Sequence, residues 1–342
     1  MSNSRRTLLC CIVLAVSPTI ASAQSASSHA LRFFGTGTNQ QDRVRIRVDD
    51  NAPGPDTSEP IDVGSGSFTI ELWLRGNLSD NNTIRGLGDR EYFDFRWIDG
   101  NIIVDRDIWG ASSRDWGISL AGGFVQFGTG RADANPLDLE HTIEGNTNVL
   151  DGAWHHVAVA RDVGTGVKRI FVDGLLDYAS PPNRSRDDIS YPNSGDSSPQ
   201  TPWGPFIVLA AEKHDAGSTY PSFNGYLDEL RIWNIARSST DLGATFDLVL
   251  ASTSPGLVGY YRFEEGVGTS LGDSSSAVSP SGELLAGIVG NGEWVSHATD
   301  PTNVAPIRCL PPLCTAPGDV DSDGDVDLAD LSQLLTAFGT CA

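Results

Sequence analysis

Apolar residues between about positions 29 and 298 recur with a period of two rather than 3.6, which is the pattern of β-strands. In segment 67–75 the apolar and polar side chains alternate: Phe68, Ile70, Leu72 and Leu74 fall on one face, and Thr69, Glu71, Trp73 and Arg75 on the other. This alternation predicts an antiparallel strand that is buried on one face only.

Further β-prone runs follow, separated by breaks rich in glycine, proline, asparagine and serine. They lie at 154–161, 168–172, 175–178, 206–210, 226–233 and 257–263. Asp173 and Gly174 separate two of these runs and favour the type I′ turn of a hairpin, because both central residues of that turn need a positive φ. Many short strands without intervening helices predict an all-β sandwich or barrel.

Eight short motifs occur in order along the same region. They are ALRFFG at 30–35, DRVRI at 42–46, FTIELW at 68–73, WHHVAV at 154–159, FVDG at 171–174, FNGYLDELRIWN at 223–234, VGYYRFEEG at 258–266 and GEWV at 292–295. The ordered set resembles the laminin G-like, concanavalin A-like jelly rolls. The resemblance implies two curved antiparallel sheets over residues 24–298 and a binding role, usually for glycans or proteins. Residues 77–150 hold longer insertions than this family requires and 181–203 form a polar loop, so specificity is expected there.

The N-terminus has the features of a signal peptide over residues 1–23. Arg5 and Arg6 precede a short apolar run at 8–16, and Ala21-Ser22-Ala23 forms an A-x-A cleavage site. The apolar run is shorter than the roughly 20 residues that span a bilayer. We therefore expect an exported chain without membrane insertion, which is secreted, periplasmic or on the cell surface. The two arginines leave the choice between the Sec and Tat routes open.

The chain of 342 residues is strongly acidic. It has 23 Lys and Arg against 44 Asp and Glu, which gives a formal net charge of −21. Nucleic acids and anionic membranes attract basic surfaces, so this balance argues against both as partners. It permits the binding of cations, above all Ca²⁺, and of neutral or cationic surfaces.

Six aspartates near the C-terminus have the spacing of an EF-hand-type calcium loop. The pattern D-x-D-x-D-G-x-x-D-x-x-D places them at Asp319, Asp321, Asp323, Asp325, Asp327 and Asp330. Side-chain oxygens fall at loop positions 1, 3, 5, 9 and 12, a backbone carbonyl is expected at position 7, and Gly324 stands where the chain turns sharply. This is the ligand set of a hard cation, and we expect Ca²⁺ to be the cofactor.

An amphipathic helix is predicted directly after the loop. Its apolar residues recur at helical spacing: Leu331, Leu334, Leu335 and Phe338. Gly339 ends the pattern. Loop and helix resemble one repeat of a type I dockerin, which implies a cohesin-like partner, although dockerins normally carry two repeats and this segment has one. The sandwich is thus followed by a proline-rich linker at 299–317 and a small calcium loop–helix module at 318–342.

The mature chain keeps three cysteines, because Cys10 and Cys11 leave with the signal peptide. Three cysteines allow one bridge and one leftover thiol. A Cys314–Cys341 bridge, which would clasp the C-terminal module, is slightly preferred over Cys309–Cys314.

Three tryptophans in the insertion region are candidate ligand-binding residues. Trp97, Trp109 and Trp116 lie beside many Asp, Arg and Gly residues, where exposed indoles would stack on sugars. Ordinary packing is the competing interpretation. His155 and His156 are adjacent on a predicted strand and point to opposite faces, so they cannot hold one metal ion together.

Catalytic patterns are weak. Residues 268–272 fit G-x-S-x-G, but a Gly- and Ser-rich loop follows where a nucleophile elbow needs a helix. Glycosidases need two carboxyl groups across a cleft. Asp228 and Glu229 are neighbours on a strand and face oppositely, and Asp228 is expected to satisfy buried backbone groups. No catalytic residue is predicted.

The expected function is that of an exported, non-catalytic binding protein. A jelly-roll domain would recognise a glycan or an extracellular or cell-surface protein, and a calcium-binding module would follow it. Two alternatives stay open. One is a polysaccharide hydrolase or lyase on the same fold, and the other is a cell-surface structural or adhesion component docked through its C-terminal module.

Overall fold

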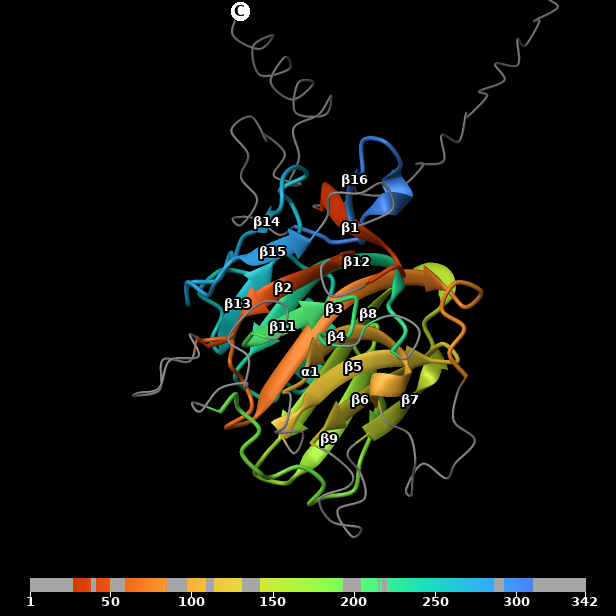
Figure 1. The fold of residues 1–342 in the computed structure, drawn as a ribbon. Coiled ribbons are helices and arrows are strands. Elements are labelled where there is room, and N and C mark those ends of the chain that lie inside the picture. The colour runs from red at the N-terminus through yellow and green to blue at the C-terminus, as the bar shows by residue number, and fades with distance from the viewer. Residues whose placement is uncertain are drawn as a thin grey trace, which may run out of the picture.

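Two antiparallel β-sheets pack face to face in the computed structural model of the chain (Figure 1). The structure describes residues 27–37, 41–49, 59–84, 97–108, 114–130, 142–192, 204–214, 216, 220–285 and 292–309. The predicted signal peptide, Trp109, Cys314, Cys341 and the whole calcium module lie outside the described residues.

Sheet I contains strands in the order β10-β9-β8-β3-β12-β1-β16, and β13 also pairs with β12. Its strands are β1 (His29–Phe34), β3 (Phe68–Asn77), β8 (Asp151–Asp162), β9 (Val167–Val172), β10 (Leu175–Ala179), β12 (Asn224–Trp233), β13 (Leu257–Tyr261) and β16 (Glu293–Ser296). All of these pairings are antiparallel.

Sheet II contains strands in the order β14-β15-β2-β11-β4-β5-β6-β7, again antiparallel throughout. Its strands are β2 (Arg43–Arg47), β4 (Asn101–Arg106), β5 (Trp116–Ala121), β6 (Phe124–Thr129), β7 (Thr142–Asn148), β11 (Phe206–Leu209), β14 (Ser270–Leu271) and β15 (Gly282–Leu285). The helical segments described are the helix α1 (Ser239–Thr245) and the 3₁₀ helices η1 (Trp97–Asp99) and η3 (Pro301–Asn303). The two sheets confirm the all-β fold class.

The main apolar core lies between the two sheets. The apolar face predicted for β3 belongs to it in full: Phe68, Ile70, Leu72 and Leu74. Val44 and Ile46 of β2 contribute from sheet II. Asp173 and Gly174 join β9 to β10 with φ angles of 51° and 75°, the positive values that a type I′ turn requires. The local strand and hairpin predictions are therefore confirmed.

The outer face of sheet I is covered as well, so the prediction of a strand buried on one face only is wrong for β3. Glu71 is 0% exposed and Trp73 is 4% exposed. Trp73 packs against Val249, Ala305 and Ile307, which come from segments far away in the sequence. Because a distant part of the chain supplies this second layer, the pattern within β3 could not reveal it.

Helix α1 packs on the same outer face, against β8 and β9. A capping box starts it: the Ser238 hydroxyl accepts a hydrogen bond from the Asp241 backbone, and the Asp241 carboxylate accepts one from the Ser238 backbone. Leu242 packs against Ala158 and Phe171. The helix thus belongs to the outer layer that buries Glu71.

Asp228 of β12 ties the first and last described segments to the sandwich. Its Oδ2 accepts hydrogen bonds from the Ser27 hydroxyl at 2.8 Å and from the Ala305 backbone N–H at 3.0 Å. Burial, and then the charge of Glu229, raise the pKa of Asp228 well above 3.8. The expectation that Asp228 satisfies buried backbone groups is confirmed.

Cys309 stands at the end of the described chain and is disulfide-bonded, with its partner outside the described residues. Cys314 and Cys341 lie outside the described residues, so the choice between the Cys314–Cys341 and Cys309–Cys314 bridges stays a prediction. Cysteine spacing in the sequence does not show which Cα atoms come within bridging distance.

Candidate functional site

Two of the three tryptophans predicted to stack on sugars, those within the described residues, do not present their rings to solvent. Trp97 and Trp116 are 4% and 1% exposed. Trp97, in η1, lies over Gly117 of β5 and Gly128 of β6, which are opposite each other across the two strands. Trp116 packs in the core, 5.4 Å from Phe68 between ring centroids. Ordinary packing is the correct interpretation at these two positions.

His155 and His156 of β8 have separate partners. His156 is 1% exposed, and its Nε2 is 2.9 Å from a carboxylate oxygen of Glu71. His155 reaches Asp173 through Nδ1 at 2.9 Å and Asp151 through Nε2 at 3.2 Å. The hydrogen bond to Asp173 is the largest influence on the pKa of His155, which is raised. One histidine is packed and the other is partly exposed.

Glu71 is the centre of a buried ionic network in the outer layer of sheet I. It accepts hydrogen bonds from Trp233 Nε1 at 2.7 Å, Arg237 Nη1 at 2.8 Å and His156 Nε2 at 2.9 Å. Burial raises the pKa of Glu71, but the His156 hydrogen bond and the neighbouring charges, first that of Arg231, lower it to about 2. The carboxylate therefore links β3 to β8, to the end of β12 and to Arg237 on the outer face of sheet I.

A row of arginine and aromatic side chains crosses the outer face of sheet I. Strand register places Arg32 of β1, Tyr226 of β12, Arg75 of β3 and Trp154 of β8 opposite one another in turn. The guanidinium carbons of Arg32 and Arg75 lie 5.1 Å and 4.7 Å from the centroid of the Tyr226 ring. The Trp154 and Tyr226 centroids are 6.1 Å apart, and the Phe34 ring extends the row 4.5 Å beyond Arg32. We call these five residues the Arg–aromatic row.

Every residue of the Arg–aromatic row is partly exposed. A guanidinium has five N–H donors. Within the described residues, Arg32 uses two of them, on Asn224 Oδ1 at 2.7 Å and on the Gly225 carbonyl at 3.2 Å. Arg75 uses one, on the carbonyl of Thr302. The row therefore combines aromatic faces with further hydrogen-bond donors of positive charge.

A second group of polar residues meets on the outer face of sheet II. Strand β11 runs beside β4 with Val208 opposite Asp105. At Ala210 a φ of 68° redirects the chain, so that the residues after it lie beside the end of β4. There the Lys213 backbone N–H donates to Asp105 Oδ2 at 2.5 Å.

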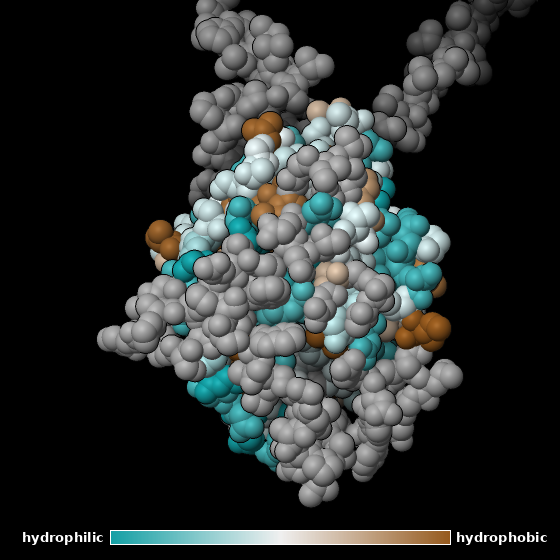
Figure 2. All heavy atoms as spheres, viewed as in Figure 1, coloured by the Kyte–Doolittle hydropathy of each residue, from teal (hydrophilic) through white to brown (hydrophobic). Residues whose placement is uncertain are grey.

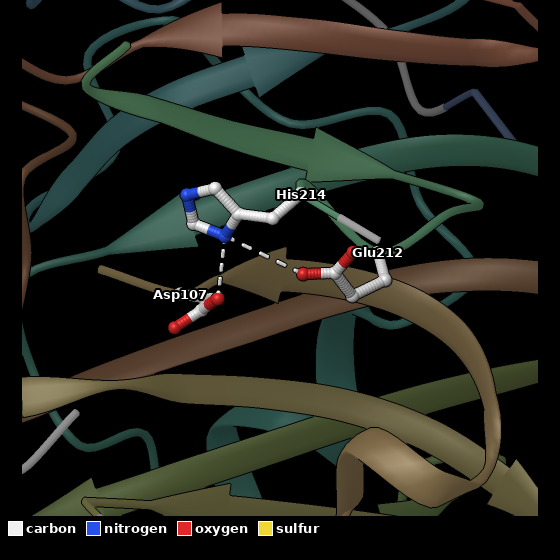
Figure 3. A group of neighbouring side chains, drawn as sticks. All are labelled: Asp107, Glu212 and His214. Atoms are coloured by element: carbon white, nitrogen blue, oxygen red, sulfur yellow. Dashed lines mark hydrogen bonds and ion pairs between the residues drawn. The ribbon is translucent and has the colours of Figure 1, made fainter. Parts of the chain in front are cut away.

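Asp107, Glu212 and His214 converge at this place (Figure 3). The His214 Nδ1 is 2.6 Å from Asp107 Oδ2 and 3.5 Å from Glu212 Oε1. The three ligand atoms all lie within 4.8 Å of one another, so the group could hold a metal ion. We call it the carboxylate–histidine cluster.

The surroundings of the cluster shift the pKa values of two neighbouring carboxyl groups in opposite directions. Burial raises the pKa of Asp107, but the His214 hydrogen bond and the charges of His214 and Lys213 lower it to about 2. Burial, followed by the charges of Glu212 and Asp107, raises the pKa of Asp105 well above 3.8. Asp107 is therefore negatively charged at neutral pH.

The sequence pattern alone identifies neither of these two groups. Alternation places Arg32 and Tyr226 on outward-facing positions, but the row depends on the register of four strands. The Glu-Lys-His run at 212–214 follows a strand, but the cluster depends on the turn at Ala210 and on Asp107 from another strand. The alternation and the Glu-Lys-His run thus indicate polar positions, but they do not show which of these side chains contact one another in the fold.

The remaining exposed apolar side chains are scattered. In the view of Figure 2 the hydrophobic areas are small and separated by hydrophilic ones. The large hydrophobic residues exposed in the described ranges are Leu78, Ile84, Leu175, Leu176, Ile235, Val267 and Val278. Isolated apolar residues of this kind are ordinary on a folded protein. Within the same ranges, no helix combines the length and the apolar character that crossing a bilayer requires.

Sequence comparison identifies one family. The profile of the Concanavalin A-like lectin/glucanases superfamily matches residues 49–243, which is more than half of the chain. No curated protein sequence matches the chain.

Several solved structures are similar to this chain at low identity. A putative carbohydrate binding protein from Bacteroides ovatus is 18% identical with a TM-score of 0.49, and the match covers 83% of this chain and 62% of that one. The Ruminococcus gnavus IT-sialidase CBM40 bound to alpha2,3 sialyllactose is 12% identical with a TM-score of 0.41, over 65% of this chain and 99% of that one. A heptameric SAP-like pentraxin from Limulus polyphemus is 13% identical with a TM-score of 0.38, over 64% and 81%. This chain thus spans less than two thirds of the Bacteroides ovatus protein.

Proposed function

Because this chain belongs to the concanavalin A-like lectin/glucanases superfamily, we propose that its sandwich is a non-catalytic recognition domain for oligosaccharides. The observation that carries the proposal is the Arg–aromatic row on the outer face of sheet I. We infer that this row is the binding surface and that it prefers sugars with a carboxylate group.

The row has the chemistry that such a ligand needs. A sugar ring has a face of C–H groups that packs against aromatic rings such as Tyr226 and Trp154. A guanidinium presents a planar set of donors that matches a carboxylate, and Arg32 and Arg75 flank the Tyr226 ring. From Arg32 to Trp154 the row crosses four strands that are about 4.8 Å apart. This length fits a short oligosaccharide better than a single sugar.

Tyr226→Ala is expected to weaken the binding of an acidic oligosaccharide about tenfold or more, because both arginines lose the ring on which they stack. Tyr226→Phe keeps the ring and should bind within about twofold of the wild type. Isothermal titration with sialyllactose and an oligogalacturonate, each beside a neutral sugar of equal length, measures both effects.

Two arginine variants separate charge from stacking in this experiment. Arg75→Ala should lower the preference for acidic over neutral sugars. Arg169→Ala is the matched control, because Arg169 of β9 is a partly exposed arginine of the same sheet outside the row. If Tyr226→Ala binds every sugar as the wild type does, the row is not the binding surface. If the wild type binds no sugar of either class, the domain has another ligand.

We propose that this domain binds without turnover. Glu229 is held by Tyr260 Oη at 2.6 Å, Arg231 Nη2 at 2.9 Å and Arg262 Nε at 3.2 Å. Asp228 likewise serves structural hydrogen bonds. A glycosidase needs two carboxyl groups available across a cleft. Turnover of a polysaccharide, abolished by a single Asp or Glu substitution, would favour the enzymatic alternative.

We further propose that the chain is exported and that Ca²⁺ folds its C-terminal module. Both proposals come from the sequence of residues 1–23 and 318–342, which lie outside the described ranges. In the full chain, Ca²⁺ is expected to increase the helical circular dichroism signal, because the six aspartates repel one another without a cation. The double variant Asp319→Asn, Asp321→Asn should lose this increase. A wild-type spectrum that does not respond to Ca²⁺ would contradict the proposal.

A further inference from the structure

We propose that the carboxylate–histidine cluster binds a divalent transition ion of the Zn²⁺ type, at a site separate from the predicted calcium loop. Its ligand atoms are Asp107 Oδ2, Glu212 Oε1 and His214 Nδ1. The bound ion fastens the segment after β11 to the end of β4.

Two of the three separations between the ligand atoms lie within about 1 Å of the tetrahedral value, and the third is at most 4.8 Å. Zn²⁺ binds imidazole nitrogen and carboxylate oxygen at about 2.0–2.2 Å, so two ligand atoms of a tetrahedron are about 3.4 Å apart. The distance from His214 Nδ1 to Glu212 Oε1 is already 3.5 Å. The distance from His214 Nδ1 to Asp107 Oδ2 is 2.6 Å. It has to open by less than about 1 Å when the ion replaces the shared proton.

The donor set selects against calcium. Ca²⁺ takes about six to eight oxygen ligands, whereas the cluster offers one nitrogen and two carboxylates. Three protein ligands of this kind and an open fourth position are typical of zinc. The Asp107 side chain is 14% exposed, and the side chains of His214 and Glu212 are 2% and 1% exposed. The ion therefore enters past Asp107.

Hydrogen bonds from neighbouring residues hold the ligands in place. Arg43 Nη1 donates to the Glu212 carbonyl at 2.8 Å, and Lys213 Nζ donates to the Asp107 carbonyl at 2.5 Å. Both bonds reach main-chain carbonyls, so they fix the backbone that carries two of the ligands.

Titration of Co²⁺ into the full chain tests the site, with excess Ca²⁺ present to fill the oxygen-rich loop. Four-coordinate Co²⁺ absorbs visible light much more strongly than six-coordinate Co²⁺. We expect an intense band that saturates at one equivalent and that Zn²⁺ removes. His214→Gln and Asp107→Asn should each weaken Co²⁺ binding about tenfold or more. Circular dichroism checks that each variant is folded, and if one is not, the other decides.

Two further variants are the controls. His155 also contacts two aspartates, but through different ring nitrogens, so His155→Gln should retain the band. Asp319→Asn changes the calcium loop and should retain it too. A wild type without a Zn²⁺-sensitive band overturns the proposal, and so does a band that persists in both His214→Gln and Asp107→Asn. The cluster is then a structural hydrogen bond between a histidine and an aspartate.

Discussion

Replacing Glu71 by alanine is expected to lower the free energy of unfolding by about 3–5 kcal/mol. The carboxylate is 0% exposed and accepts hydrogen bonds from His156, Trp233 and Arg237. Its removal leaves three donors buried without this acceptor and takes away the ion-pair partner of Arg237. Arg237 also donates to the Asp241 carbonyl at 3.1 Å, so the loss extends to the attachment of α1.

The same carboxylate makes stability depend on pH in the acid range. Burial raises the pKa of Glu71, but the His156 hydrogen bond and the charges of Arg231 and Arg237 outweigh burial, so the pKa is about 2 in the folded protein against an ordinary 4.5. A lowered pKa stabilises the folded state fully above pH 4.5, and the contribution of about 3 kcal/mol is lost as the pH falls towards 2. The difference in unfolding free energy between the wild type and Glu71→Gln should therefore shrink between about pH 5 and pH 2.

Urea unfolding followed by tryptophan fluorescence measures both results. The matched control is Glu283→Gln, because Glu283 also pairs with an arginine, Arg45 at 2.6 Å, but its side chain is 54% exposed. Exposed pairs contribute about 0–1 kcal/mol, so this variant should stay close to the wild type. If Glu71→Ala costs no more than Glu283→Gln, the network does not stabilise the outer layer.

Gly128→Ala is expected to destabilise the sandwich by about 3 kcal/mol, at the upper end of the cost of overpacking. A Cβ at Gly128 would lie 1.7 Å from Trp97 Cδ1, and a Cβ at the opposite Gly117 would lie 2.1 Å from Trp97 Cζ3. The buried indole occupies the space above both glycines, so a methyl group at either position displaces it. Chemical denaturation of the purified variant gives the cost.

A double-mutant cycle identifies the cause of this effect. In a Trp97→Ala background the indole is absent, and Gly128→Ala should cost at least about 2 kcal/mol less than in the wild type. Gly66→Ala is the control, since a Cβ there meets nothing within 4 Å, and it should change stability by about 0.5 kcal/mol or less. Equal costs of Gly128→Ala in both backgrounds would show that the contact with Trp97 is not the reason.

The features that could be predicted from the sequence depend on nearby residues. The alternation of apolar and polar residues predicts the apolar face of β3, and the turn-forming residues Asp173 and Gly174 predict the hairpin. Both predictions are confirmed. The burial of Glu71 and Trp73 was not predictable in this way. Their side chains alternate correctly with the core, but a layer from more than 150 residues further along the chain covers them.

The candidate sites also depend on residues that are distant in the sequence, so the sequence alone could not locate them. Its residue type and polar neighbours make Trp97 a candidate for sugar binding, but in the structure it is buried against a pair of glycines. The residue type alone therefore did not separate a binding indole from a packed one. The Arg–aromatic row shows the converse, because Arg32 and Tyr226 look like ordinary outward positions until the strands are paired.

The sequence by itself determined the all-β class, the local hairpin and the acidic balance, because alternation, turn preference and charge depend only on residue type and short spacing. Only the tertiary structure decided which polar residues meet. Asp107 and His214 are 107 residues apart in the chain, and their contact needs both the pairing of β4 with β11 and the turn at Ala210. Strand register is set by the burial of whole faces, so it is a property of the packed sandwich and of no single segment.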